Sequence, residues 1–326
     1  MRTTRERAPR RTARQTTTIA IPVALAAAAL LGCSSSDSAA PDAAVLRPGV
    51  IDSSQVYQGT PSEHERAFWA SILDASDARR ATAVQQLIAD AQTDPTNGYT
   101  QFLIGVSFFM PPRAAVEALA NGTAPPPFSP SPDAAPFLDQ GLMHLTDPLY
   151  MGFDGMLLTG FLFAVNDPRA PAIATAALQH NPAAMSFGAI VGALSGGDGA
   201  AGLEHMFAFL DFCAGAPVAR DGTDAGQLVA KMNTGALQHR ECFSGSYSPH
   251  GSSGHLQLAG DLQAINGHPE AARRYYEAVK QTSDYATWPL ASITERRLAV
   301  GATAPVVEEV AAIASTCGTC HTKALR

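Results

Sequence analysis

The stretch that decides the fold is residues 258–279, LAGDLQAINGHPEAARRYYEAV, near the end of the 326-residue chain. Gly267 lies in its middle, where a glycine ends a first helix at little steric cost. The small residues Gly260 and Ala272 allow two helices to approach closely, and Tyr276 fills the groove against the next hairpin. The stretch therefore predicts a helical hairpin.

A similar arrangement of small and large residues recurs upstream, at intervals that are not a strict repeat. The offsets in the hairpin resemble those of tetratricopeptide repeats, and this resemblance implies an all-α, tetratricopeptide-like helical-hairpin array over residues 60–300. Chance matches in alanine-rich helices are the alternative. The upstream matches are Ala83, Leu87, Pro95, Ile104, Gly105 and Phe108, followed by Thr159, Gly160, Phe163, Asp167 and Ala172.

The composition of the chain and the positions of its prolines and glycines agree with a helical protein. Apolar residues make up 46% of the chain and aromatic residues only 7%, which favours a helical protein over a sandwich or a barrel. Eight prolines within residues 111–136 forbid a continuous helix and predict a surface insertion between hairpins. The glycine-rich residues 195–199 have no Lys-Ser/Thr pair after them, so we interpret them as a hairpin turn rather than a phosphate-binding loop.

The first ordered helix is expected to start after residue 60. Thr60 can cap it, Pro61 suits its first position, and Glu63 completes a capping box ahead of Phe68 and Trp69.

The N-terminus is typical of an export signal. Six arginines precede an apolar run of 13 residues, 19–31, which is too short to span a bilayer comfortably. The run ends in Leu30-Leu31-Gly32-Cys33, which resembles the lipobox of bacterial lipoproteins. That resemblance implies a signal peptide at 1–32, a lipid on Cys33 and a periplasmic membrane anchor, with Ser34 favouring the outer membrane. Residues 33–59, small and polar, predict a flexible tether.

The charge of the mature chain limits its partners. Without residues 1–32, 16 basic and 28 acidic residues remain, a net charge of −12. Because nucleic acids and anionic lipid surfaces repel an acidic protein, neither is expected as a partner.

The C-terminus carries the pattern Cys317-Gly318-Thr319-Cys320-His321. Two thiols three positions apart on a helical turn can add across the two vinyl groups of haem, and the adjacent imidazole then lies over the iron. The pattern resembles the attachment signature of c-type cytochromes. By that resemblance Cys317 and Cys320 bind one haem c covalently, and His321 is its proximal axial ligand.

The motif has three other possible interpretations. A thioredoxin-type dithiol is disfavoured because that motif opens a long helix, and zinc is disfavoured because only three ligands are clustered. Coincidence in a disordered tail is the third. The position of the motif resembles class II cytochromes, which carry it on the last helix of a bundle, and implies a haem-carrying segment at 301–326. We expect residues 269–283, with Tyr275 and Tyr276, and residues 287–300, with Trp288, to shield the haem.

The sixth iron ligand and the remaining cysteines are not fixed by the sequence. The distal candidates are His255 and His250, in or beside a Ser/Gly-rich loop, and Met206 or Met232. Cys213 and Cys242 are free to form a disulfide in an oxidising compartment, with two buried thiols as the alternative.

Together these patterns predict a lipid-anchored periplasmic protein that transfers electrons to or from a protein redox partner. No hydrolase motif such as Gly-x-Ser-x-Gly or His-Glu-x-x-His occurs in the sequence, which lowers the expectation of an enzyme. Two alternatives are a helical scaffold with a structural haem, and a haem enzyme or gas sensor with an open axial site.

Overall fold

A computed structural model describes residues 62–73, 76–126, 130–237, 251–301, 305 and 307–318. The predicted signal peptide, Cys33 and the tether up to residue 59 lie outside the described residues.

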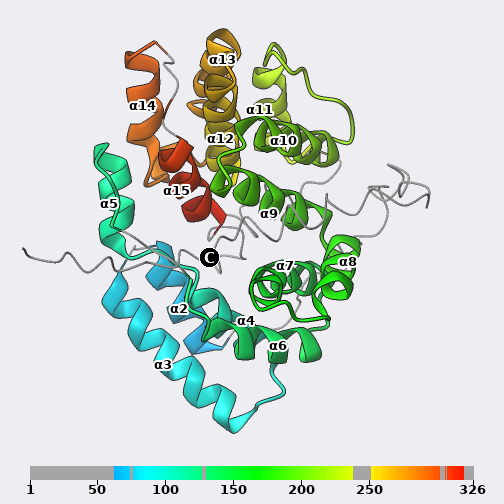
Figure 1. The fold of residues 1–326 in the computed structure, drawn as a ribbon. Helices are drawn as coiled ribbons and strands as arrows, with labels where there is room; N and C mark the ends of the chain where they lie inside the picture. Colours follow the sequence, from blue (N-terminus) through cyan, green and yellow to red (C-terminus); the bar gives the residue numbers. More distant parts are fainter. Residues whose placement is uncertain are drawn as a thin grey trace, which may run out of the picture.

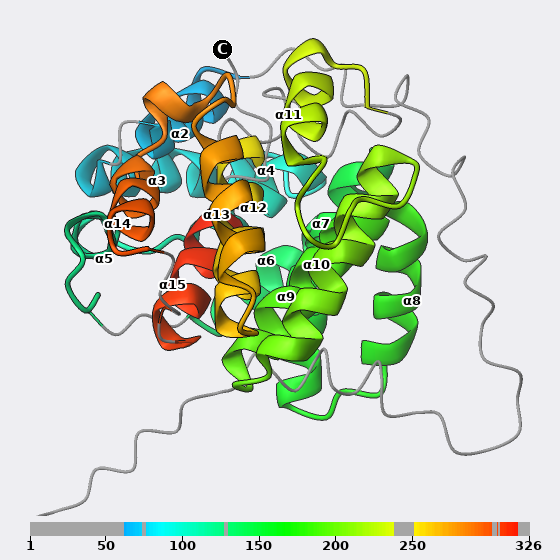
Figure 2. The ribbon, with the colours of Figure 1, turned by 90° about the horizontal axis from the view of Figure 1, so that it is seen from above.

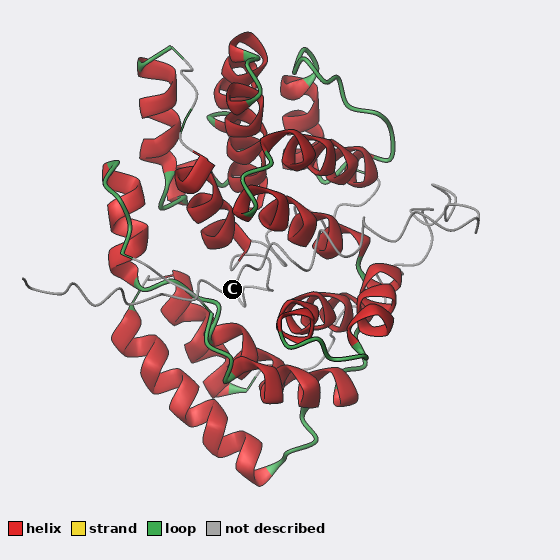
Figure 3. Ribbon diagram, viewed as in Figure 1, coloured by secondary structure: helices red, strands yellow, loops and turns green. Residues whose placement is uncertain are grey.

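The described residues form an all-α protein, which confirms the predicted fold class (Figure 3). They contain fourteen α-helices, one short 3-10 helix and no strand. None of these helices combines the length and apolar composition that crossing a bilayer requires. The helices are α2 (Glu63–Leu73), α3 (Asp77–Thr93), α4 (Gly98–Ser107), α5 (Arg113–Asn121), α6 (Ala134–His144), α7 (Pro148–Ala164), α8 (Ala170–His180), α9 (Pro182–Ser195), α10 (Gly199–Ala214), α11 (Ala225–Thr234), α12 (Gly251–Ile265), α13 (Pro269–Val279), η4 (Tyr285–Thr287), α14 (Ala291–Ala299) and α15 (Val307–Gly318).

Most helices pack as hairpins with a neighbour in the chain (Figure 1). The pairs are α2 with α3, α7 with α8, α9 with α10, and α12 with α13, while α4 pairs with α6 across the intervening α5. Short connections cause this arrangement, because two helices joined by a few residues must run antiparallel and side by side. The glycine-rich residues 195–199 are the turn between α9 and α10, as predicted.

The α12–α13 hairpin has the turn and the close helix approach that its sequence predicts, while the ring of Tyr276 lies against Gly260 of the same hairpin. Gly267 adopts φ +80° at the turn, and a Cβ at Gly260 would collide with the ring of Tyr276. Ala272 and Tyr276 are fully buried. Gly260 therefore allows α13 to approach α12 so closely.

The upstream matches are less exact. A Cβ at Gly160 would meet nothing within 4 Å, so this glycine does not mediate the predicted close approach. Gly152 and Gly155 do so instead, because they face Asn181 and Ala177 across α7 and α8. The repeat phase predicted for this hairpin is thus displaced towards the start of α7.

The first helix begins with a capping box that is shifted by two residues from the predicted one. Ser62 Oγ accepts a hydrogen bond from the Glu65 N–H at 3.1 Å, and Glu65 Oε2 accepts one from the Ser62 N–H at 2.9 Å. Both pairs fit the same sequence pattern, and Phe68 and Trp69, which follow on the same helix, are buried.

Residues 111–136 are more than a surface insertion. They contain α5, which packs against α14 and α15, and Leu119 lies in the core of the C-terminal half. Arg296 of α14 donates hydrogen bonds to the carbonyl groups of Leu119 and Ala120 at the end of α5. The prolines do interrupt the helices, as predicted, but α5 between them packs against the C-terminal half of the protein.

The described residues form two large hydrophobic cores and two small clusters. One joins side chains of α2–α4, α6–α9 and the loops between them, and the other joins α9–α15 with the end of α5. Figure 2 shows α9 beside α10 in one half and close to α7 of the other. Helix α9 therefore contributes to both cores.

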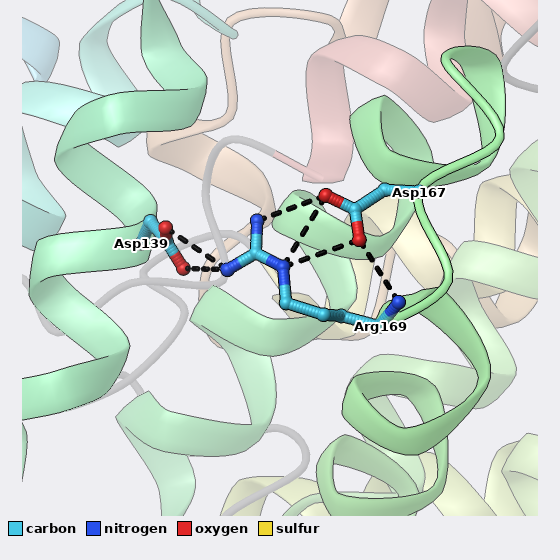
Figure 4. Close-up of polar contacts among 3 residues, drawn as sticks. All are labelled: Asp139, Asp167 and Arg169. Atoms are coloured by element: carbon cyan, nitrogen blue, oxygen red, sulfur yellow. Dashed lines mark hydrogen bonds and ion pairs between the residues drawn. The ribbon is translucent and has the colours of Figure 1, made fainter.

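The N-terminal core contains a buried carboxyl group. Asp154 of α7 is 0% exposed, and neither of its oxygens has a hydrogen-bond partner among the described residues. Burial raises the pKa of this carboxyl well above its ordinary value of 3.8, and the charge of Asp139 acts in the same direction. Arg169 offsets part of that charge, since it binds Asp139 at 3.0 Å and Asp167 on its other side (Figure 4).

We predict that Asp154 makes the protein less stable as the pH rises. Below pH 3.8 the group is protonated in both folded and unfolded chains, whereas above it the unfolded chain ionises more readily. The free energy of unfolding should then fall by about 1.4 kcal/mol per pH unit until the raised pKa is reached. Asp154→Asn should remove this contribution, so its stability advantage over the wild type should grow between pH 4 and 8 in urea titrations. A constant difference would contradict the prediction.

Candidate functional site

The motif helix α15 is an integral part of the fold. It runs from Val307 to Gly318, so Cys317 belongs to its last turn, while Cys320 and His321 lie outside the described residues. Val310, Ile313 and Ala314 are fully buried in the C-terminal core. The segment predicted as a tail at 301–326 thus begins with a docked helix.

Helix α15 packs chiefly against α9 and α12, and it also contacts α5. Of the residues expected to shield a haem, Tyr275 donates a hydrogen bond to the carbonyl of Ala219, and Tyr276 donates one to the carboxylate of Asp261. The shielding itself stays a prediction. Trp288 is buried in the same core as α15. The contact with α9 joins segments more than 100 residues apart, for which the local sequence pattern carries no signal.

His255 lies inside the core on α12, one of the helices that pack against α15. Its ring stacks on Phe209 at 4.5 Å with an interplanar angle of 12°, and Phe187 of α9 approaches its edge at 5.2 Å. The residue is 1% exposed, and its Nε2 atom is buried. An iron could reach this nitrogen only if the surrounding rings moved apart, so the contacts describe a packed core histidine.

Two other distal candidates, Met206 of α10 and Met232 of α11, are buried members of the C-terminal core to which α15 also belongs. His250 lies outside the described part of the chain. The identity of the sixth ligand stays a prediction.

Cys213 is fully buried on α10 and is disulfide-bonded. Its predicted partner, Cys242, lies outside the described residues, so the pairing stays a prediction.

A buried polar cluster links α15 to three other helices. Asp261 of α12 is fully buried, and its Oδ1 atom accepts three hydrogen bonds. The Arg297 guanidinium then reaches Glu309 of α15, with Nη2 3.0 Å from Oε2. The three donors to Asp261 are Tyr276 Oη at 2.7 Å, Arg297 Nε at 2.9 Å and Gln257 Nε2 at 3.1 Å.

The charges in this cluster influence one another strongly. Burial raises the pKa of Asp261 above its ordinary value, while the charge of Arg297 and the hydrogen bonds oppose the rise. Burial would lower the pKa of Arg297, but the charges of Asp261 and Glu309 outweigh it and the pKa is raised. Burial and the neighbouring Asp261 likewise raise the pKa of Tyr276. Asp261, Arg297 and Glu309 together carry one negative charge when all three are ionised.

No other constellation of ligating side chains competes with the motif in the part of the chain that the structure describes. There, no group of three or more His, Cys, Asp or Glu side chains could hold a metal ion. His64 of α2 pairs with Asp90 of α3 at 2.6 Å, and His268 pairs with the nearby Gln263 at 2.8 Å.

Comparison with known proteins identified no match. No protein-family model, no curated protein and no solved structure matches this chain.

Proposed function

We propose that this chain is a lipid-anchored, periplasmic electron-transfer protein with one haem c on Cys317 and Cys320 and with His321 as the proximal ligand. The observation that carries the proposal is the motif itself, two thiols and an imidazole within five residues at the end of a helix whose inner face is buried. A thioether-linked haem would be held at a fixed place on such a helix.

The chemistry of the donor set fits a haem. Thiols and imidazole are the side chains that attach a haem c and ligate its iron. Helix α15 packs on an apolar layer to which α9 and α12 contribute Phe187 and Leu256, and such a layer excludes water from one side of the helix. When bound, haem would supply one-electron chemistry.

The protein residues would then hold and orient the redox centre. Val310, Ile313 and Ala314 fix α15 on the core, and the ion pair between Arg297 and Glu309 restrains its first turn. His321 would bind the iron and set its electron density through the axial bond.

Cellular placement follows from the N-terminal features. A lipid on Cys33 would anchor the protein at the periplasmic face of a membrane, more specifically the outer membrane, and residues 34–59 would tether the helical body. The acidic body favours a protein redox partner with a complementary basic surface over nucleic acid.

The test is an absorption spectrum of the protein made in a bacterial strain with haem-maturation machinery, followed by a pyridine haemochrome assay. We expect the spectrum of a covalently bound haem that is reversibly reduced without substrate. A colourless protein, from cells that load a control c-type cytochrome, would overturn the proposal.

One observation favours a second function, namely ligand binding at an open axial site. Because His255 is enclosed by Phe187 and Phe209, it is poorly placed to complete the coordination of an iron. Rapid carbon monoxide binding to the reduced protein, unchanged in His255→Phe, would support a five-coordinate iron. A low-spin spectrum that His255→Phe converts to high-spin would instead identify His255 as the sixth ligand.

A further inference from the structure

The buried cluster around Asp261 has an asymmetry that points to proton binding. All three hydrogen bonds to this carboxylate end on Oδ1. Oδ2 is equally buried, yet it has no hydrogen-bond partner among the described residues. A proton could therefore bind Oδ2 without breaking any of the three hydrogen bonds, and it would remove the uncompensated charge of the cluster.

The groups that act on Asp261 come from the helices around it. Tyr276 of α13 and Arg297 of α14 touch it directly, and Glu309 of α15 is joined to it through Arg297. No titratable group of α10, which also packs on α12, is among the causes of its pKa shift. Glu309 is partly exposed, so the cluster lies close to solvent, from which a proton can come.

Glu309 of the cluster and Cys317, the first residue of the motif, share one helix. Glu309 and Cys317 are eight residues apart on α15, which corresponds to about 12 Å along the helix axis. The intervening side chains Val310, Ile313 and Ala314 are fully buried. Charges interact more strongly across such an apolar interior than through water, so a change of charge at the motif would be felt at Asp261.

We propose that Asp261 is a redox-linked proton site, which takes up one proton at Oδ2 when the haem on α15 is reduced. The inference rests on the proposed function. A one-electron donor protein passes one electron to the ferric iron, which becomes ferrous, and one proton from solvent converts the Asp261 carboxylate to a carboxylic acid. On reoxidation the electron leaves to an acceptor protein and the proton returns to solvent.

The direction of the pH effect follows from linkage. Because a proton accompanies the electron, reduction becomes less favourable as protons become scarce, and the reduction potential should fall as the pH rises. The equilibrium constant for reduction changes by at most tenfold per pH unit, which is about 59 mV for a one-electron couple. Outside the range between the pKa values of Asp261 in the oxidised and reduced protein, the potential should be constant.

The experiment is a mediated potentiometric titration of the haem-loaded protein from pH 4.5 to 9, with redox-difference infrared spectra. In the wild type we expect a sloping potential and a carboxylic-acid C=O band that appears on reduction. Asp261→Asn should lose both the slope and the band. Asp154→Asn, which changes a buried carboxyl in the other core, should keep both.

Two milder variants keep the proposal testable if Asp261→Asn does not fold. Tyr276→Phe removes one donor to the carboxylate, so it should move the sloping range to higher pH, whereas Glu309→Gln removes a negative charge and should move it to lower pH. A reduction potential of the haem-loaded wild type that does not change with pH would overturn the inference. So would a pH-dependent potential that persists in Asp261→Asn, or a pH-dependent range that is the same in both milder variants as in the wild type. These outcomes would leave the proposed function standing, whereas a chain without covalent haem would refute that function itself.

Discussion

Replacing Cys317 and Cys320 together with serine is expected to leave the purified protein without covalent haem. A serine hydroxyl does not form the thioether bond to a vinyl group, so both attachment points are lost. The fold should persist, because the core contacts of α15 come from Val310, Ile313 and Ala314. The measurement is a pyridine haemochrome spectrum, with a thermal unfolding curve to confirm folding.

A matched control is Thr319→Ala, which lies between the two cysteines and leaves the attachment residues unchanged. It should retain haem at the wild-type level. Full covalent loading of the double serine variant would show that the haem is attached at other residues. The single variant His321→Ala should still carry thioether-linked haem, but with an altered spectrum, since only the axial bond is removed.

Arg297→Met should cause the largest loss of stability in the described cluster. Arg297 is buried and pairs with Asp261 and Glu309, and removing one partner of a buried ion pair costs about 3–5 kcal/mol because the other charge is left unpaired. The free energy of unfolding from urea titrations measures this loss. Since Asp261 can take up a proton, the cost should shrink at acidic pH.

Two comparisons isolate the cause. Arg273→Met breaks an exposed pair with Glu277 on α13 and should change stability by less than about 1 kcal/mol. Combining Arg297→Met with Asp261→Asn should cost less than the sum of the two single substitutions, because no buried charge remains unpaired. Strictly additive losses would show that the two side chains do not stabilise each other.

The hairpins could be predicted because their determinants are local in the sequence. Gly260, Gly267 and Tyr276 lie within one hairpin, and their sizes alone require a close helix pair with a turn between. Where two candidates fit the same pattern, the sequence alone does not choose between them. Two possible capping boxes overlap at the start of α2, one beginning at Thr60 and one at Ser62, and the structure has the one at Ser62.

The contacts that α15 makes with distant segments could not be predicted because they are non-local. Arg297 is 36 residues from Asp261, and α9 is separated from α15 by more than 100 residues. The one local signal was an aspartate beside Gly260, in the middle of an otherwise uncharged helix. A charge at such a position implies a buried partner, but not which residue supplies it.

The most direct test of the haem assignment is the mass of the intact protein, purified from cells that load a control c-type cytochrome, together with peptide mapping. We predict a mass increase of one haem, located on a peptide that contains Cys317 and Cys320. A chain with no added haem mass, or with haem on a peptide that lacks both cysteines, would contradict the assignment.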